Sequence, residues 1–125
     1  MFWRRGRKSS TARDSGKCLN EYMIKAVINH LKMIIPGFPF MIDQYTRFNY
    51  NRSFWDILQE SPSKAIEIIR EYYTMREEYY LYIVYEMIRV LTSGNHNKID
   101  EIIEAIKKKN YEYIDKILCI GGSSS

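Results

Sequence analysis

The stretch Ser61–Leu91, SPSKAIEIIREYYTMREEYYLYIVYEMIRVL, decides the fold of this chain. It opens on a helix start signal, a serine N-cap followed by Pro62 at the first helical position. No further Gly or Pro interrupts it before the Ser93-Gly94 pair, which is typical of a helix end. The sequence therefore predicts one continuous helix over residues 61–92, about 45 Å long at roughly 1.5 Å per residue.

Apolar residues in this stretch recur every three or four positions, as on the buried face of a helix. Two adjacent stripes, of which the first is interrupted only by Arg76, make a face wider than a two-stranded coiled-coil seam. Tyr, Ile and Val also favour strands, but the helical period continues on both sides of Tyr79–Tyr85, which favours a helix. The two stripes are Ile66, Ile69, Tyr73, Tyr80, Ile83, Met87 and Val90, and Ala65, Ile68, Tyr72, Met75, Tyr79 and Tyr82.

Start and stop signals place the other elements around this helix. Asn20 can cap a helix that Pro36-Gly37 ends, and Ser53 with Asp56 resembles a capping box. We expect an all-α fold, a single helical bundle of about five helices built around the Tyr-rich helix. The expected elements are a helix over 20–35, an aromatic connector over 36–52, a short helix from Ser53, the 61–92 helix, and a hairpin of helices over 98–108 and 111–119.

Charge divides the 125 residues into a tail and a body. Residues 1–17 hold six basic side chains against one acidic, whereas the remainder holds 13 basic and 14 acidic. We predict a disordered basic N-terminal tail over 1–17, one helical domain over 18–120 and a flexible C-terminal end over 121–125. The sequence lacks a signal-peptide apolar region and a run of about 18–20 apolar residues, so a soluble cytoplasmic protein is expected. Low Gln with high Lys and Glu resembles thermophile usage, and an AT-rich genome would give much the same bias.

Residues that could carry chemistry are few. The sequence contains no GxGxxG, P-loop, CxxC or HExxH motif. Cys18 and Cys119 are interpreted as ordinary thiols, and His96 as a solvated turn residue. His30 is interpreted as a partly buried histidine that is bonded to a carbonyl or to water. Lys107–Lys109 ends a helix, where positive charge is favourable. We expect no catalytic residues, no metal and no cofactor, and therefore not an enzyme.

Two groups of residues are candidate binding sites. Six tyrosines cannot all face one core, so the surplus predicts an interface with another copy or another protein. The basic residues of the tail could contact phosphate, in nucleic acid or at an anionic membrane. The candidate interface is Tyr72, Tyr73, Tyr79, Tyr80, Tyr82 and Tyr85, and the candidate phosphate contacts are Arg4, Arg5, Arg7 and Lys8.

Residues 19–73 carry a family resemblance. The stretch Lys25-Ala26-Val27-Ile28-Asn29-His30-Leu31, and the segments Phe54–Leu58 and Ser61–Ile69, resemble the nitrosopumilus output domain family of small archaeal helical domains. The resemblance implies an archaeal source and an output or sensing role in signalling. It carries over no catalytic residue and no role for His30.

The sequence thus favours a non-enzymatic helical protein-interaction or signalling-output module that self-associates through an aromatic helix face. The alternative is a nucleic-acid-binding protein that uses the basic N-terminal arm.

Overall fold

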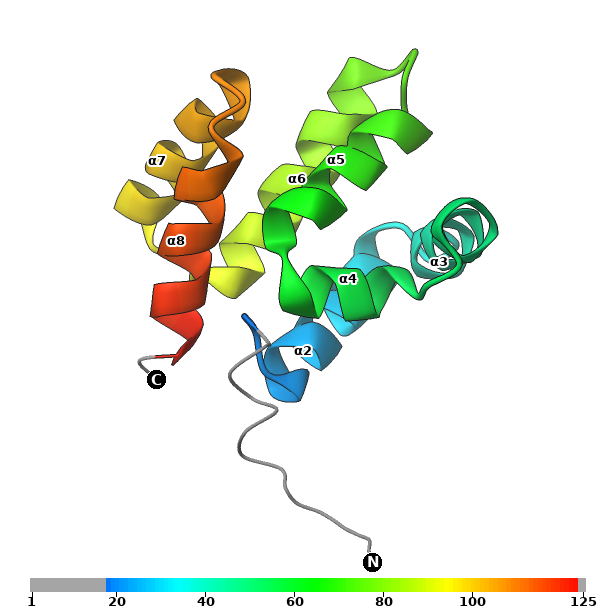
Figure 1. The fold of residues 1–125 in the computed structure, drawn as a ribbon, viewed down its shortest axis with the longest axis horizontal. Coiled ribbons are helices and arrows are strands. Elements are labelled where there is room, and N and C mark those ends of the chain that lie inside the picture. Colours follow the sequence, from blue (N-terminus) through cyan, green and yellow to red (C-terminus); the bar gives the residue numbers. More distant parts are fainter. Residues whose placement is uncertain (1–17, 124–125) are drawn as a thin grey trace, which may run out of the picture.

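A computed structural model describes residues 18–123, and every regular element in that range is a helix (Figure 1). The expected all-α class is therefore confirmed, but seven helices replace the expected five or so. The tail over 1–17, with the candidate phosphate contacts Arg4, Arg5, Arg7 and Lys8, lies outside the described residues. The helices are α2 (Glu21–Ile34), α3 (Phe38–Tyr50), α4 (Phe54–Glu60), α5 (Pro62–Tyr72), α6 (Glu77–Leu91), α7 (His96–Lys107) and α8 (Tyr111–Ser123).

The prediction of one helix over 61–92 is wrong. The chain leaves α5 after Tyr72, turns, and runs back alongside it as α6 (Figure 1). The Thr74 hydroxyl donates to the Glu71 carbonyl at 2.6 Å, and Arg76 N–H donates to the Tyr73 carbonyl at 2.8 Å. The Thr74 side-chain bond competes with helix continuation, and the Arg76 bond closes a backbone turn. The break falls where Arg76 interrupts the apolar stripe, so the sequence held the signal for it.

The predicted connector over 36–52 is largely the helix α3. Pro36-Gly37 does end α2, but Pro39 lies in the first turn of α3, where a missing N–H costs nothing. The helix ends at Asn51, whose φ of +58° is left-handed. Two prolines therefore mark the boundary between two helices and do not make a loop.

The remaining elements agree with the sequence in kind. Asn20 caps α2 by accepting from Met23 N–H at 2.8 Å. At α4, Ser53 is the N-cap as expected, but the partner that completes the cap is Asp43, which accepts from Phe54 N–H at 2.9 Å. The predicted hairpin is α7 and α8, although Asn95 and not Asn97 caps α7. The last helix extends to Ser123, three residues into the segment assigned to a flexible end.

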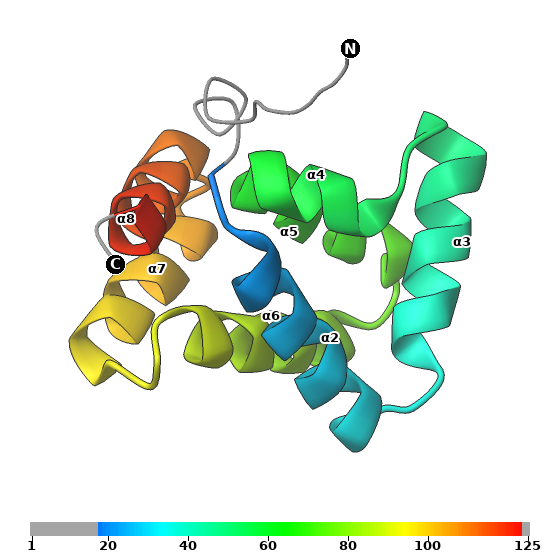
Figure 2. The ribbon, with the colours of Figure 1, turned by 90° about the horizontal axis from the view of Figure 1, so that it is seen from below.

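The core lies where the α5–α6 hairpin is covered from both sides. Figure 2 shows α2 crossing α6, and α4 and α5 on the opposite side of the core. The α7–α8 pair closes one end of the molecule and α3 the other (Figures 1 and 2). Fully buried side chains come from all seven helices; among them are Val27, Leu31, Ile42, Phe54, Leu58, Ile68, Ile69, Ile83, Met87, Ile102 and Ile114. Within the described range, no helix combines the length and apolar character needed to cross a bilayer.

Two residues of α2 give a matched test of this packing. Leu31 is fully buried, whereas Met33 is 79% exposed. We expect Leu31→Ala to lower the free energy of unfolding by about 2–5 kcal/mol, because it leaves a cavity against α6, and Met33→Ala to lower it by less than about 0.5 kcal/mol. Urea denaturation followed by circular dichroism measures both. Equal losses would contradict the assigned orientation of α2.

Candidate functional site

The six candidate interface tyrosines occupy three different environments. Tyr79, Tyr82 and Tyr85 on α6 are 47%, 46% and 37% exposed. Tyr80, on the opposite side of the same helix, is 5% exposed and belongs to the core, where burial raises its pKa. Tyr80 is therefore not an interface residue in this fold, and replacing it would test stability instead of association.

Tyr72 and Tyr73 are fixed in an aromatic cluster that joins α3, α5 and α6. The Phe38 ring lies 6.4 Å from Tyr72 and 6.1 Å from Tyr73, measured between centroids. Tyr73 is also 5.8 Å from Tyr79, which links the cluster to α6. Both tyrosines are partly buried, and their rings serve the packing of the hairpin turn more than an external surface.

The exposed tyrosines of α6 lie on one stripe with charged residues at its ends. Glu78, Tyr82, Tyr85 and Arg89 are spaced at i, i+4, i+7 and i+11, and all four are exposed. This spacing is that of a helix–helix seam. Tyr79 lies beside the stripe, with the Arg76 guanidinium 5.4 Å from its ring centroid. We call Glu78, Tyr82, Tyr85 and Arg89 the tyrosine stripe.

An ion-pair cluster borders the tyrosine stripe and fixes α6 to α2. The Nε2 atom of His30 lies 2.7 Å from Oε1 of Glu86, and Arg89 donates to the same oxygen at 2.8 Å. Burial alone would raise the pKa of Glu86, but the hydrogen bonds from His30 and Arg89 outweigh it and hold the pKa below its ordinary value. The Glu86 side chain is 12% exposed. His30 is partly buried, as expected, but its partner is the Glu86 carboxylate and not a carbonyl or water.

A second carboxylate fixes α3 to α5. The Tyr50 hydroxyl donates to Glu71, with oxygen distances of 2.6 and 2.7 Å, and the Tyr45 hydroxyl lies 3.4 Å from the same group. The hydrogen bond to Glu71, together with burial, raises the pKa of Tyr50 to about 12. Both tyrosines therefore stay protonated and act as donors at neutral pH.

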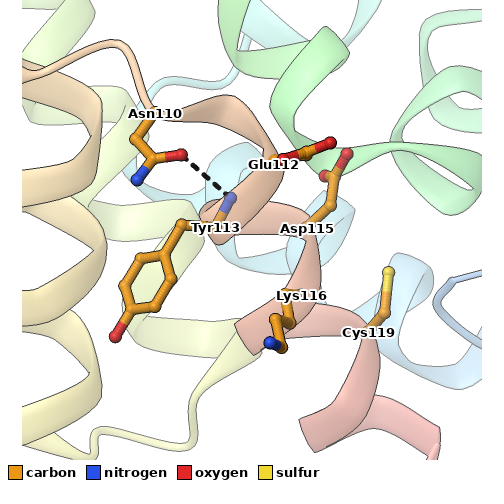
Figure 3. Close-up of a pocket in the computed structure, with 6 residues that line it drawn as sticks. All are labelled: Asn110, Glu112, Tyr113, Asp115, Lys116 and Cys119. Carbon is orange, nitrogen blue, oxygen red and sulfur yellow. Dashed lines mark hydrogen bonds between the residues drawn. The ribbon is translucent and has the colours of Figure 1, made fainter.

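An open depression on α8 is a further candidate for a ligand site (Figure 3). Three of its polar residues are engaged in the fold. Asn110 accepts from Tyr113 N–H at 3.3 Å, and the Tyr113 hydroxyl reaches Glu101 of α7 at 3.2 Å. Asp115 accepts from α5, as described below. Across residues 18–123, no three His, Cys, Asp or Glu side chains are grouped to hold a metal ion. We therefore assign these residues to the docking of α8.

Cys18 and Cys119 form a disulfide, so the interpretation as ordinary thiols is wrong. Their Cα atoms are 4.6 Å apart although 101 residues separate them in sequence. Cys18 is placed there by its own backbone, since the N–H groups of Cys18 and Leu19 both donate to the Gln59 carbonyl, at 2.8 and 2.9 Å. Nothing in the spacing of the two cysteines predicts this pairing, because it depends on where α4 and α8 end.

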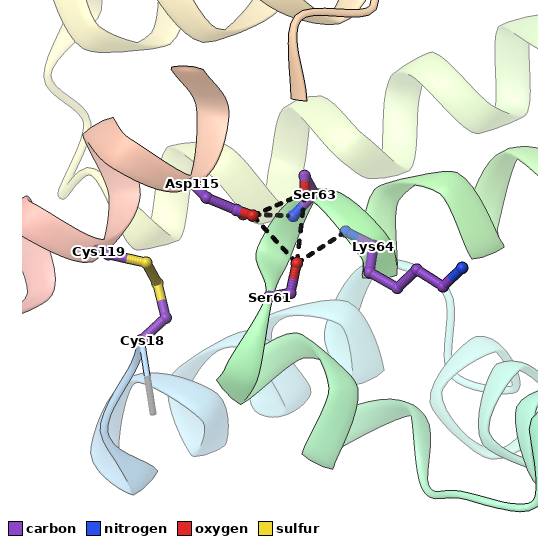
Figure 4. The surroundings of a disulfide bond; sticks show 6 residues. All are labelled: Cys18, Ser61, Ser63, Lys64, Asp115 and Cys119. Atoms are coloured by element: carbon purple, nitrogen blue, oxygen red, sulfur yellow. Dashed lines mark hydrogen bonds between the residues drawn. A yellow bond between two sulfur atoms is a disulfide. The ribbon is translucent and has the colours of Figure 1, made fainter. Parts of the chain in front are cut away.

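Asp115, one turn before Cys119, caps α5 from outside (Figure 4). It accepts from Ser63 N–H and from the Ser63 hydroxyl, both at 2.8 Å, and from the Ser61 hydroxyl at 3.1 Å. A carboxylate at a helix N-terminus satisfies free N–H groups and complements the helix dipole. Asp115, the buried Leu118 and Cys119 lie on one face of α8 and dock it on the start of α5. The sequence offered Ser61 as a cap but no sign of Asp115.

No protein family, curated protein or solved structure matches this chain. The resemblance of residues 19–73 to the nitrosopumilus output domain family therefore stays a prediction.

The disulfide yields a direct prediction. Closing a loop of about 100 residues is expected to stabilise a fold by up to about 4.7 kcal/mol, and native disulfides typically contribute about 2–5 kcal/mol. Reduction should lower the free energy of unfolding by that amount, as measured by urea denaturation with and without dithiothreitol. A Cys18→Ala/Cys119→Ala variant should be equally destabilised and insensitive to the reductant. Two free thiols titrated in the folded, unreduced protein would contradict the pairing.

The Glu86 cluster predicts a pH dependence. Because folding lowers the pKa of Glu86, its ionised form stabilises the fold above the ordinary value of 4.5, and this contribution is lost as pH falls through the lower, folded pKa. Glu86→Gln should cost about 1–2 kcal/mol at pH 7, and the difference from the unmodified chain should shrink towards pH 3. Asp100→Asn, at an exposed position in the second turn of α7, is the control and should change little. A difference independent of pH would refute the role of the charge.

Proposed function

We propose that this chain is a non-enzymatic protein-interaction module that self-associates through the tyrosine stripe of α6. The observation that supports the proposal is the symmetry of the stripe. Tyr82 and Tyr85 are equally distant from its midpoint, and so are Glu78 and Arg89. A twofold axis through that midpoint would place Tyr82 of one copy opposite Tyr85 of the other. It would likewise place Glu78 of one copy opposite Arg89 of the other. Twofold dimers require this kind of self-complementary surface.

The composition of the stripe suits an interface. Tyrosine buries a large ring while keeping its hydroxyl available for hydrogen bonds, and it is enriched where proteins bind each other. Charges of opposite sign at the two ends favour the antiparallel arrangement of α6 and disfavour the parallel one, in which like charges meet. Met33 of α2, 79% exposed, follows His30 by one turn and can extend the apolar surface beyond α6.

The disulfide bears on where such a module could work. Disulfides persist in oxidising compartments and also inside hyperthermophilic archaea and bacteria. A cytoplasmic location is therefore compatible with the thermophile-like composition, and a role as an archaeal signalling output domain fits both. Self-association would then be the signalling output, because a signal that changes the fraction of dimer changes whether the tyrosine stripe is exposed or covered.

Light scattering after gel filtration, over a concentration series, tests the proposal. The unmodified chain should show twice the mass of one chain at high concentration. Tyr82→Asp should reduce it to one chain, because it would bury an unpaired charge against Tyr85 of the other copy. Phe48→Asp is the matched control: it places the same charge on an exposed aromatic position of α3 and should leave the dimer intact. A monomer at every concentration would refute self-association.

Charge exchange tests the antiparallel arrangement itself. Glu78→Arg should weaken the dimer, because it would then face Arg89 of the other copy. Combining Glu78→Arg with Arg89→Glu restores opposite charges across the axis and should recover most of the affinity, as a double-mutant cycle measures. Because Arg89 also donates to Glu86 at 2.8 Å, urea denaturation of each variant controls for the loss of that contact. No recovery would contradict the proposed pairing while leaving self-association by another geometry to the Tyr82 result.

A further inference from the structure

The disulfide between Cys18 and Cys119 joins two groups of helices that otherwise pack separately. Helix α2, which follows Cys18, packs mainly on α3, α4 and α6, whereas α8, which contains Cys119, packs mainly on α5 and α7. The backbone N–H of Cys18 donates to the Gln59 carbonyl at the end of α4. The covalent bond therefore supplies a link between α2 and α8 that helix packing supplies only weakly.

A hollow of about 320 Å³ lies beside this link. Its walls come from both groups of helices and include Met23 of α2, Leu91 at the end of α6, and Ile117 and Leu118 of α8. The turn of α8 that carries Cys119 thus also forms part of the wall. Protein interiors are otherwise close-packed. The start of α2 and the second half of α8 are therefore held together across a space, and the disulfide is what spans it.

The disulfide can be reached from outside the molecule. Both cysteines are partly exposed, and Cys119 lines the open depression on α8 (Figure 3). Lys116 lines the same depression one turn before Cys119, and a nearby cation favours the thiolate form of a cysteine. The Asp115 carboxylate is engaged by hydrogen bonds from the start of α5, and Glu112 lies two turns from Cys119. Accessible disulfides are the labile ones, because exchange requires the approach of a thiolate.

We propose that this disulfide is a reversible redox site, at which a dithiol reductant releases α8 from the start of α2 in the folded chain. A thiolate of the reductant attacks Sγ of Cys119, the S–S bond breaks, and Cys18 leaves as a thiolate that takes up a proton. The second thiol of the reductant then attacks the reductant's own sulfur in the mixed disulfide, and Cys119 leaves and is protonated. Two electrons pass to the chain, the reductant becomes a disulfide, and a disulfide oxidant reverses the sequence.

The release is local, because other contacts keep the first turns of α8 in place. Asp115 still accepts from Ser63 N–H at 2.8 Å, and Ile114 is fully buried. Reduction therefore opens the hollow between α2 and α8 while the α5–α6 hairpin keeps its packing. This local opening is distinct from the loss of global stability that reduction also causes. It does not involve the tyrosine stripe, so it does not depend on the proposed self-association.

The rate at which dithiothreitol reduces the full oxidised chain, without denaturant, tests whether the folded state is attacked. Alkylation with iodoacetamide and mass spectrometry count the thiols over time. Leu31→Ala destabilises the core and should leave the rate unchanged, because direct attack does not require global unfolding. A rate that rises by roughly 30-fold or more, as the loss of core stability predicts, would mean that the bond is reached only from the unfolded chain and would overturn the proposal. A bond that is not reduced at all would overturn it too. Ile68→Val makes the same comparison with a milder change if Leu31→Ala does not fold.

Hydrogen exchange over seconds to minutes, followed by mass spectrometry, locates the release. In the reduced chain the first two turns of α2 and the second half of α8 should exchange faster. The α5–α6 hairpin should keep its protection at these times, since its buried amides exchange through larger openings. The Cys18→Ala/Cys119→Ala variant should show the reduced pattern with and without reductant, and oxidised glutathione should restore the original pattern only in the unmodified chain. Unchanged exchange after reduction, or an equal increase in all helices, would contradict the release of α8.

Discussion

The fold depends on the need to bury the apolar stretch between Pro62 and Leu91 on more than one side. A straight helix of that length would leave much of a wide apolar face in water. The turn between Tyr72 and Glu77 folds the stretch into the α5–α6 hairpin, whose halves cover each other. The remaining sides are then covered by α2 across α6 and by the α7–α8 pair at one end. Burial of apolar surface is the dominant favourable contribution to folding, and each peripheral helix is placed by this hairpin.

In addition to this core, specific contacts fix the two ends of the described chain. The disulfide between Cys18 and Cys119 fixes the entry to α2 against α8, and Asp115 fixes α8 on the start of α5. Both contacts lie within two turns of α8 and act on the same junction (Figure 4). They constrain which way the last hairpin packs, a choice that an apolar face alone leaves open because hydrophobic contact is not directional.

Two exposed surfaces remain after the core is accounted for, and they differ in chemistry. The tyrosine stripe combines amphipathic rings with charges of both signs, which gives directionality and suits a second protein copy. The outward face of α3 exposes two phenylalanines and a methionine, Phe40, Phe48 and Met41, and the neighbouring Arg47 is already paired with Asp43.

The sequence by itself determined the helical class, the caps at Asn20, Ser53 and Ser61, and the helical hairpin at the end of the chain. These follow from local signals, because a cap or an apolar period acts within about one turn. Two local signals led to wrong predictions. Pro39 suggested a connector where α3 begins. The absence of Gly or Pro suggested one long helix where Arg76 and Thr74 allow a turn. Only the tertiary structure decided that Cys18 meets Cys119, that Asp115 caps α5, that Tyr80 is buried while Tyr82 is exposed, and that α3 turns phenylalanines outward. Each of these depends on contacts between residues far apart in sequence. A local signal carries no information about which distant residue a side chain will contact in the fold.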